Sequence, residues 1–358
     1  MDILKYMKKH GHEQLMMCSE PSVGLRAFIA IHDTTLGPAV GGVRIWPHKT
    51  EEDALMDVLR LSQAMTYKSA AADLPLGGGK GLIMADPKKD KSEALLRAYA
   101  RYVDTLGGRY VTTTDVGSTT RDLEYIALET KYVTGLPTSM GGSGDTSALT
   151  GLGVYMGMRA CAKAVWGSDS LSGRTVAMQG FGKVAYSTAK HLLNDGASLV
   201  ATDIYEGALE KAREMGVSVV EPEEIYDVAC DVFSPCALGG VLNSDTIPRL
   251  RCRIVAGGAN NQLLNGENGV ELHRRGIVYA PDYIINAGGI INVACEMDGS
   301  YNADRAREMT ERIFETMERV LHIASSDEMP TSQAADRLAE ERIESVRSVR
   351  RIYRRHWK

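Results

Sequence analysis

The sequence predicts an α/β protein made of two domains. Its 358 residues exceed one domain of ordinary size and suffice for two hydrophobic cores. In the first half, strand-like apolar runs alternate with helical segments such as 51–68, where apolar residues recur every three to four positions. From Arg174 the pattern becomes strand, glycine turn, helix and strand, which is typical of a βαβ unit.

The first domain is expected to cover residues 1–134. Apolar faces at helical spacing predict helices at 1–12, 51–68 and 91–106. Short apolar runs predict strands at 24–33, 39–47, 81–85 and 109–113. The triple glycine at 77–79 carries no side chains, so a ligand can press against its backbone; the alternative is an ordinary glycine turn.

The second domain is expected to cover residues 135–330, and a loop rich in Gly, Ser, Thr and Pro at 135–150 leads into it. Helices are expected at 152–165, 285–296 and 303–325, and further strands at 217–220, 228–233, 252–256 and 277–279. The basic stretch 331–358 is predicted to be a helix that packs back onto the first domain. It could contact nucleic acid, but a solvated or subunit-interface helix fits the acidic total charge better.

Composition narrows the class of protein. With 44% hydrophobic and 24% charged residues, the chain is typical of a globular protein, and a net charge of −5 argues against nucleic acid and membrane surfaces as partners. Six scattered cysteines form no CxxC pair, so we expect neither a metal site nor a disulfide framework. Residues 1–17 lack the apolar core of a signal peptide, and no apolar run reaches 18 residues, so a cytoplasmic protein is expected.

Two lysines mark a candidate site in the first domain. Lys68 ends the helical run, and Lys80 follows the triple glycine twelve positions later. Two ammonium groups in one cleft repel each other and burial disfavours both charges, so one of them could lose its proton and act as a general base. Either lysine alone would be interpreted as a surface residue, but the pair around the glycines favours a site.

A dinucleotide fingerprint marks the second domain. The strand run 175–179 is followed by Gly180-Phe181-Gly182-Lys183-Val184-Ala185-Tyr186, which contains G-x-G-x-x-A and opens a helix. The next strand ends at Asp203, 23 residues after Gly180, where an acidic residue would accept hydrogen bonds from the adenosine ribose. No Arg or Lys follows it directly to bind a 2′-phosphate, so NAD is expected in preference to NADP.

Several motifs resemble those of the amino-acid dehydrogenase family, which includes the glutamate, leucine, phenylalanine and valine enzymes. They are Met65-Thr66-Tyr67-Lys68, Gly77-Gly78-Gly79-Lys80 and Thr114-Asp115-Val116-Gly117, with further similarity at 31–39, 259–263 and 280–283. The similarity covers nearly the whole chain and is greatest to the leucine and phenylalanine branches. It implies an α/β substrate-binding and oligomerisation domain, a Rossmann-type NAD-binding domain and a homo-oligomer.

The resemblance also implies reversible oxidative deamination of an L-amino acid to a 2-oxo acid and ammonia. Lys80 would activate the attacking water, Asp115 would carry a proton to and from the amino group, and Lys68 would bind the α-carboxylate. Asn261 would lie near the substrate and Thr150 near the nicotinamide; without the resemblance, Asn261 is a loop amide that bonds its own backbone. A non-catalytic NAD-binding protein and a different NAD-dependent enzyme stay as alternatives, and the second would leave both lysines unexplained.

The side-chain pocket that the resemblance implies is almost entirely apolar. Its lining comprises Val40, Gly41, Met65, Thr113, Thr134, Ile290 and Val293. Glutamate dehydrogenases carry a lysine where Val40 stands, and a buried carboxylate without a cation is costly, so glutamate is disfavoured. The branched Thr113 takes room that an aromatic ring would need. A branched aliphatic amino acid such as leucine is therefore predicted, with phenylalanine as the alternative.

Overall fold

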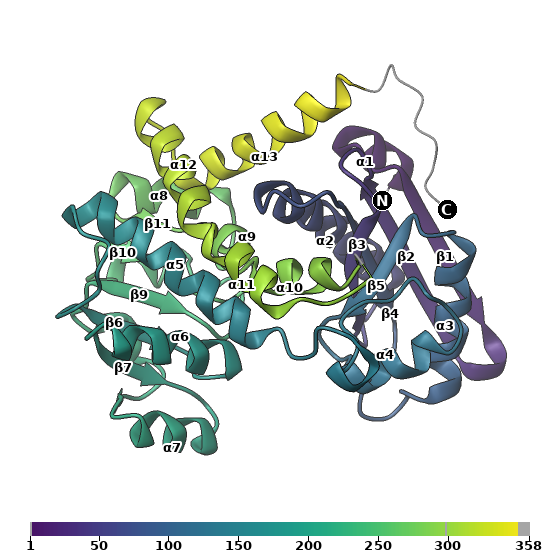
Figure 1. Cartoon of the computed structure of the whole chain (residues 1–358), viewed down its shortest axis with the longest axis horizontal. Helices are drawn as coiled ribbons and strands as arrows, with labels where there is room; N and C mark the ends of the chain where they lie inside the picture. The colour runs from purple at the N-terminus through teal and green to yellow at the C-terminus, as the bar shows by residue number, and fades with distance from the viewer. Residues whose placement is uncertain (1, 298, 350–358) are drawn as a thin grey trace. The chain divides into compact units, whose positions relative to one another are not determined.

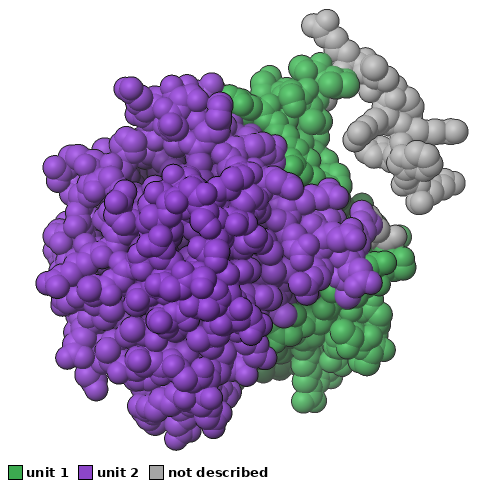
Figure 2. Space-filling view, turned by 60° about the vertical axis from the view of Figure 1, so that its left-hand side comes forward, with its two compact units in different colours: residues 1–145, 293–302, 339–358 green, residues 146–292, 303–338 purple. Residues whose placement is uncertain are grey.

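The computed structural model describes residues 2–297 and 299–349, and these form two compact units (Figures 1 and 2). Unit 1 comprises Met1–Asp145, Val293–Asn302 and Ala339–Lys358, and unit 2 comprises Thr146–Asn292 and Ala303–Leu338. The predicted α/β class is confirmed. Among the described residues, no helix is both long and apolar enough to cross a membrane.

Unit 1 is built on a mixed five-stranded sheet of order β1-β2-β4-β3-β5. Its strands are β1 (Gln14–Glu20), β2 (Leu25–Asp33), β3 (Ala39–Ile45), β4 (Gly77–Ile83) and β5 (Tyr110–Thr114). The long helix α2 (Glu51–Ala71) packs on one face, and α3 (Glu93–Thr105) and α4 (Thr120–Ala127) pack on the other (Figure 1). A short helix α1 (Ile3–His10) and a 3₁₀ turn at Pro21–Val23 complete the N-terminal part.

The triple glycine forms the start of strand β4, so the alternative of a glycine turn is wrong and the predicted strand 81–85 begins four residues earlier. A Cβ at Gly78 would overlap the backbone of Thr66 on α2, and a Cβ at Gly79 would lie 2.6 Å from the ring of Tyr110. The glycines are therefore needed for the close approach of α2 on one face and of an aromatic ring on the other. Because successive side chains alternate between the faces, Lys80 lies on the same face as Gly78, toward α2.

Helix α13 (Thr331–Arg347) contacts the C-terminal end of α2 through its second half. Arg342 donates hydrogen bonds to the carbonyls of Ser69, Ala70 and Leu74 at 3.3, 2.8 and 2.9 Å. Because the last carbonyls of a helix have no partner within it, these bonds stabilise the end of α2. Arg347 pairs with Asp33 at 2.6 Å, so these two predicted surface arginines are paired within unit 1. The rest of the predicted basic helix, 350–358, lies outside the described residues.

Unit 2 is a six-stranded, fully parallel sheet of order β11-β10-β9-β6-β7-β8. The strands are β6 (Thr175–Gln179), β7 (Ser198–Thr202), β8 (Ser218–Val219), β9 (Val232–Pro235), β10 (Ile254–Val255) and β11 (Val278–Tyr279). Counted from its own first strand, the order is 3-2-1-4-5-6, which is the doubly wound arrangement of dinucleotide-binding proteins. The chain turns from one half of the sheet to the other between β6 and β9, where such folds bind their ligands.

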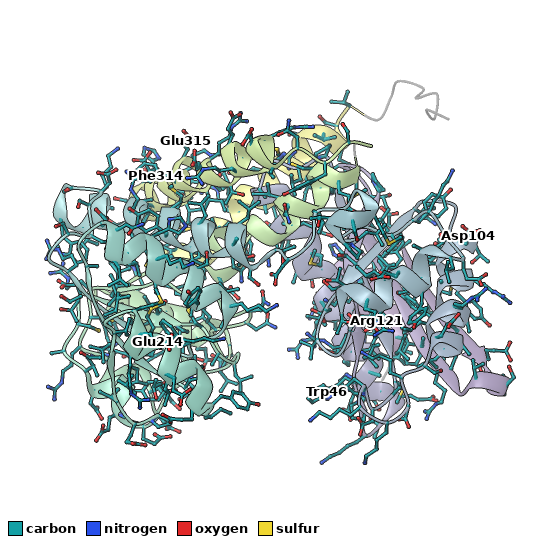
Figure 3. All side chains as sticks on the ribbon, turned by 60° about the horizontal axis from the view of Figure 1, so that its bottom comes forward. Trp46, Asp104, Arg121, Glu214, Phe314 and Glu315 are labelled. Carbon is teal, nitrogen blue, oxygen red and sulfur yellow. The ribbon has the colours of Figure 1, made fainter. Side chains whose placement is uncertain are left out.

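The helices of unit 2 are longer and more divided than the sequence suggests. They are α5 (Ser147–Trp166), α6 (Lys183–Asn194), α7 (Glu206–Glu214), α8 (Gly266–Arg274), α9 (Asp282–Ile285), α11 (Ala303–Glu311) and α12 (Ile313–Ser326), with 3₁₀ turns at Glu224–Asp227 and Ile247–Arg249. Helix α10 (Gly288–Met297) belongs partly to each unit. Phe314, labelled in Figure 3, lies on α12, and Arg159 and Lys163 of α5 lie over its ring at 5.6 and 5.5 Å, which joins these helices.

Two buried histidines hold the N-terminal segment of unit 1 against α2. His12 donates from Nε2 to the carbonyl of Leu59 at 2.9 Å, and its ring lies edge-on to His32 at 4.7 Å. His32 bonds Thr66 on α2 through Nδ1 at 2.8 Å. Burial lowers the pKa of both rings, and that of His12 falls from 6.5 to about 4. Both side chains are therefore neutral at pH 7.

This burial predicts acid-sensitive stability. Unfolded His12 binds a proton at higher pH than folded His12. The contribution of neutral His12 to the free energy of unfolding is therefore complete above pH 6.5 and is lost as pH falls toward 4. The loss amounts to at most about 3 kcal/mol. In His12→Gln, the thermal midpoint should fall less steeply over this pH range. His273→Gln, on the exposed side of α8, serves as the control, and a slope for His12→Gln equal to that of wild type would contradict the assignment.

Candidate active site

A buried ion pair lies at the centre of unit 1. Lys80 Nζ on β4 lies 3.1 Å from Asp115 Oδ2, and the side chain of Lys80 is only 6% exposed. Asp115 directly follows β5, and β3 lies between the two strands in the sheet. A Cβ at Gly42 on β3 would lie 2.8 Å from Asp115 Cβ, so only glycine leaves room for this carboxylate. The structure thus brings together the two residues that the sequence predicts to be catalytic.

Arg44 is a third member of this cluster. It donates from Nε to Asp115 Oδ2 at 2.8 Å and from Nη1 to Asp57 Oδ2 of α2 at 2.9 Å. His48 Nε2 lies 3.2 Å from the same oxygen of Asp57. The cluster therefore alternates in charge from Lys80 to Asp115, Arg44 and Asp57.

The charge of Asp115 is set by these neighbours. Burial alone would raise the pKa of its carboxyl, but Lys80 and Arg44 outweigh burial and hold the pKa below its usual range. Asp115 is accordingly an anion near neutral pH. Arg44 is also buried, and its two carboxylates overcome the cost of burial and raise its pKa.

Lys68 and Met65 lie on α2, and α2 packs on the strand that carries Lys80. Both side chains are half-buried. Thr66 between them is buried against Gly78, which sets the short distance between this part of α2 and strand β4. The register of α2 on β4 therefore places Lys68 and Lys80 on the same side of the sheet.

The residues predicted to line the side-chain pocket are divided between the two units. Ile290 belongs to unit 2 and the others to unit 1. Asn261, which is predicted to lie near the substrate, also belongs to unit 2. Thr134 donates to the carbonyl of Val293 at 2.9 Å, so these two lie together. Thr113 is buried, and its hydroxyl has no hydrogen-bond partner among the described residues.

Gly135 locates Thr113 relative to the hydrogen-bonded residues Thr134 and Val293. A methyl group built on Gly135 would lie 2.7 Å from Thr113 Oγ1 and 3.6 Å from Val293 Cγ1, which puts both side chains beside Gly135. Val40 is fully buried on β3. A Cβ at Gly41 would overlap the backbone of β4, so Gly41 serves the contact between strands.

The glycine turn of unit 2 has the form that the fingerprint predicts. Gly180 follows β6 with φ of +96°, and a Cβ there would lie 2.7 Å from that of Ala237. Gly182 is the N-cap of α6 and has φ of −72°, with open space where its Cβ would be. Ala185 is buried, as close packing of α6 requires. The open space and the helix N-terminus together suit a bound pyrophosphate.

Asp203 has a structural role that the sequence does not reveal. Its carboxylate accepts from the N–H of Phe181 at 2.7 Å and from that of Tyr205 at 3.0 Å. The acidic residue therefore fixes the glycine turn as well as standing at the end of β7. Ile204 and Tyr205 beside it are strongly exposed.

Three further residues of unit 2 are predicted to belong to the site: Thr150, Asn261 and Tyr186. Thr150 is on α5, where its hydroxyl bonds the carbonyl of Thr146 at 2.9 Å. Asn261 is exposed on a loop with a left-handed φ of +53°, and its N–H donates to Asp282. Tyr186 packs edge-on to Phe181.

No group of three or more His, Cys, Asp or Glu suited to a metal ion occurs within residues 2–297 and 299–349.

Sequence reasoning missed Arg44 and Asp57. A signal was present: Arg44 lies between two apolar residues in a predicted strand, and a cation at such a position needs a buried counter-charge. Asp57 lies on the apolar-patterned helix 51–68 and offers that charge. The pairing itself depends on the register of α2 over β3, which the sequence pattern does not specify.

The doubly wound sheet with its glycine turn defines a dinucleotide-dependent enzyme, and the comparisons identify the family. Residues 12–132 match the family model described as Glu/Leu/Phe/Val dehydrogenase, dimerisation domain. Residues 141–219 and 205–351 match that of Glutamate/Leucine/Phenylalanine/Valine dehydrogenase. The chain belongs to the Glu/Leu/Phe/Val dehydrogenase family, as the sequence motifs suggest, and it is an amino-acid dehydrogenase.

Individual relatives cover almost the entire chain. The leucine dehydrogenase of Geobacillus stearothermophilus is 52% identical over 98% of this chain and 95% of its own length. The phenylalanine dehydrogenase of Lysinibacillus sphaericus is 46% identical over 98% of this chain and 93% of its own. Among solved structures, the L-tryptophan dehydrogenase of Nostoc punctiforme has a TM-score of 0.84 at 45% identity and covers 96% of this chain and 99% of its own.

The two glycines of the turn make different predictions. In Gly182→Ala the new methyl meets open space, so the thermal midpoint should stay near that of wild type while dinucleotide binding weakens by about tenfold or more, because the methyl occupies the approach to the pyrophosphate. In Gly180→Ala the midpoint itself should fall, because of the contact with Ala237 and the positive φ. Calorimetry and titration of the cofactor measure both effects. Unchanged binding by Gly182→Ala would contradict this assignment of the turn.

Proposed function

We propose that the protein catalyses the NAD-dependent, reversible oxidative deamination of a branched-chain L-amino acid such as leucine. The products are the 2-oxo acid and ammonia. The observation that carries the proposal is the buried Lys80–Asp115 pair, because this reaction needs a general base and a proton carrier next to one carbon atom. The similarity to leucine dehydrogenases along the full chain supports the substrate class.

The chemistry assigns a step to each side chain. Lys68 binds the α-carboxylate of the substrate as a compact cation. Asp115 takes a proton from the substrate ammonium. A bound nicotinamide would supply the hydride acceptor for the α-carbon, so that the substrate becomes a protonated imine. Lys80 removes a proton from the water that adds to this imine. Asp115 returns its proton to the amino group, and the carbon–nitrogen bond then breaks to release ammonia, while the new hydroxyl group loses its proton to solvent and becomes the carbonyl of the 2-oxo acid. Asn261 and Thr150 contribute to the substrate and nicotinamide sites, in the roles that the family resemblance implies.

We assign the adenosine ribose to Asp203 and the pyrophosphate to the turn from Gly180 to Tyr186. A 2′-phosphate would meet the Asp203 carboxylate, and the two negative charges would repel each other. Ile204 and Tyr205, which follow Asp203, carry no charge that could compensate a 2′-phosphate. These contacts support NAD as the cofactor.

A spectrophotometric panel tests the function. Purified protein is mixed with NAD or NADP and a set of L-amino acids, and NADH or NADPH is followed by absorbance. We expect the highest kcat/KM with NAD and leucine, isoleucine or valine, lower values with phenylalanine, and none with glutamate. Equal kcat/KM for NAD and NADP would contradict the role of Asp203, and no turnover of any amino acid would contradict the function.

We also propose that the protein is a homo-oligomer that acts on small molecules only. The family model for residues 12–132 is that of a dimerisation domain. One solved structural relative at 26% identity is described as a hetero-hexameric glutamate dehydrogenase. Light scattering of the purified protein measures the number of copies, and a monomer would contradict this part of the proposal.

Loss of the general base predicts a specific kinetic defect. Lys80→Ala should lower kcat by about 10²–10⁴-fold, because the variant lacks the proposed general base. NAD should still bind, since the glycine turn lies in unit 2 and Lys80 in unit 1. Lys68→Ala should instead raise KM for the amino acid strongly. Near-normal turnover in Lys80→Ala would contradict the assignment.

The size of Thr113 predicts a shift in substrate preference. Thr113→Gly removes a buried side chain beside Val293 and should raise the ratio of phenylalanine to leucine activity, with Thr113→Ala intermediate. Because one methylene alters selectivity by only about 1–3 kcal/mol, a change of roughly 10-fold or more is expected. Thr112→Ser, on the opposite face of β5, is the control. A wild type that already prefers phenylalanine, or an unchanged ratio, would contradict this view of the pocket.

A further inference from the structure

We infer that Arg44 is a positioning residue that orients Asp115 and, together with Asp57, sets the pH range in which the Lys80–Asp115 pair works. The inference rests on the proposed function and adds to it a pair of groups that tune the proposed catalytic acid and base. Arg44 itself acts through Asp115, whose carboxylate it holds, and not on the substrate.

The geometry of Arg44 fits this role. Its side chain extends from β3, the strand between those that lead to Lys80 and Asp115, and it is 22% exposed. The 2.8 Å bond from Nε to Asp115 is shorter than the 3.1 Å ion pair from Lys80 to the same oxygen. Its Nη1 meanwhile holds Asp57 of α2 at 2.9 Å. A planar guanidinium that binds two carboxylates at once can rotate little, so it fixes the plane of the Asp115 carboxylate.

The charges of the cluster explain how Arg44 affects proton transfer. With Lys80 protonated, the four groups carry two positive and two negative charges and balance. Once Lys80 gives up its proton, Arg44 is the remaining cation in contact with Asp115 and stabilises that carboxylate through the cycle. Without Arg44, every protonated form in the cluster becomes more favourable. Without Asp57, the opposite holds, because a negative charge is lost.

The elements around the cluster of Lys80, Asp115, Arg44 and Asp57 carry further charged and titratable groups. His48, in the segment after β3, contacts Asp57 at 3.2 Å. Lys91 pairs with Asp122 of α4 at 2.8 Å and so balances its own charge. Tyr110 on β5 is neutral, since burial raises the pKa of its hydroxyl to about 12. On α2, Lys68 is a further cation on the side of the sheet that carries Lys80, and we assign it to the substrate carboxylate.

A purely structural ion pair is the competing explanation. If Arg44 only stabilises the fold, its loss should lower the thermal midpoint and the amount of active enzyme without moving the pH dependence of the remaining activity. Electrostatic tuning instead predicts shifts of opposite sign on removing the cation and on removing its second anion. The sign of the shift therefore separates the two explanations.

The experiment measures kcat/KM for leucine against pH in four full-length proteins. Arg44→Gln should lower kcat/KM by about 10-fold or more and move the acidic limb of the profile up by about one pH unit, since a neighbouring positive charge is lost. Asp57→Asn should move that limb to lower pH. Arg44→Lys should return the limb toward that of wild type without restoring kcat/KM, because an ammonium cannot hold both carboxylates in one plane. Arg26→Gln, which breaks the exposed pair with Glu51, should change neither quantity.

A direct measurement makes the test independent of turnover. Protein labelled with ¹³C at the aspartate carboxyl is titrated by NMR, and the Asp115 signal is assigned by its absence from Asp115→Asn. The pKa of Asp115 should be higher in Arg44→Gln than in wild type. The inference is overturned if that pKa is unchanged, or if the limbs of Arg44→Gln and Asp57→Asn are unmoved or move the same way. If wild type oxidises no amino acid, the proposed function fails, and the titration still decides the coupling between Arg44 and Asp115.

Discussion

The placement of Lys80 within strand β4 is the constraint on which unit 1 depends. A lysine on the face that α2 covers must either reach solvent or meet a counter-charge. Glycines at 77–79 let α2 and Tyr110 pack closely on the strand, which leaves Lys80 buried with Asp115 as its partner. Strand β4, with glycines at 77–79 and 81, thus carries a buried lysine. The geometry of the candidate site follows from satisfying that charge.

Satisfying one buried charge recruits others. Lys80 and Arg44 together outweigh the effect of burial on the pKa of Asp115. Arg44 in turn needs Asp57, which joins β3 to α2. A chain of alternating charges therefore connects three strands and a helix. Removing a single member of such a network lowers the stability of the fold, because a buried charge is left without a partner.

The sequence is informative where a local pattern determines the structure. The strand, the glycine turn and Asp203 predict the dinucleotide fold because they are contiguous and their spacing is fixed by one βαβ unit. The Lys80–Asp115 contact is recovered through family resemblance, since the two residues are far apart in the chain. The strand at the triple glycine is not evident from the sequence, because glycine favours turns locally and only tertiary packing of Thr66 and Tyr110 selects a strand.

Other features lie beyond any local pattern. Strand β1 (Gln14–Glu20) was not expected, since its mixed polar and apolar residues become a strand only by pairing with β2. Arg44 and Asp57 meet through the register of a helix on a sheet. The capping of α2 by Arg342 joins residues some 270 positions apart. Long-range contacts of this kind are set by the whole fold and leave little trace in the periodicity of either segment.

The discontinuity of unit 1 has a consequence for synthesis. Arg342, which completes the end of α2, and Thr134, whose partner is Val293, both depend on segments that follow the sheet of unit 2 in the chain. Because a ribosome makes the chain from the N-terminus at about 5–20 residues per second, the strands of unit 1 emerge well before these segments. Unit 1 must therefore persist with part of its packing missing while unit 2 is being made. The helix that carries Lys68 is among the last elements to be secured.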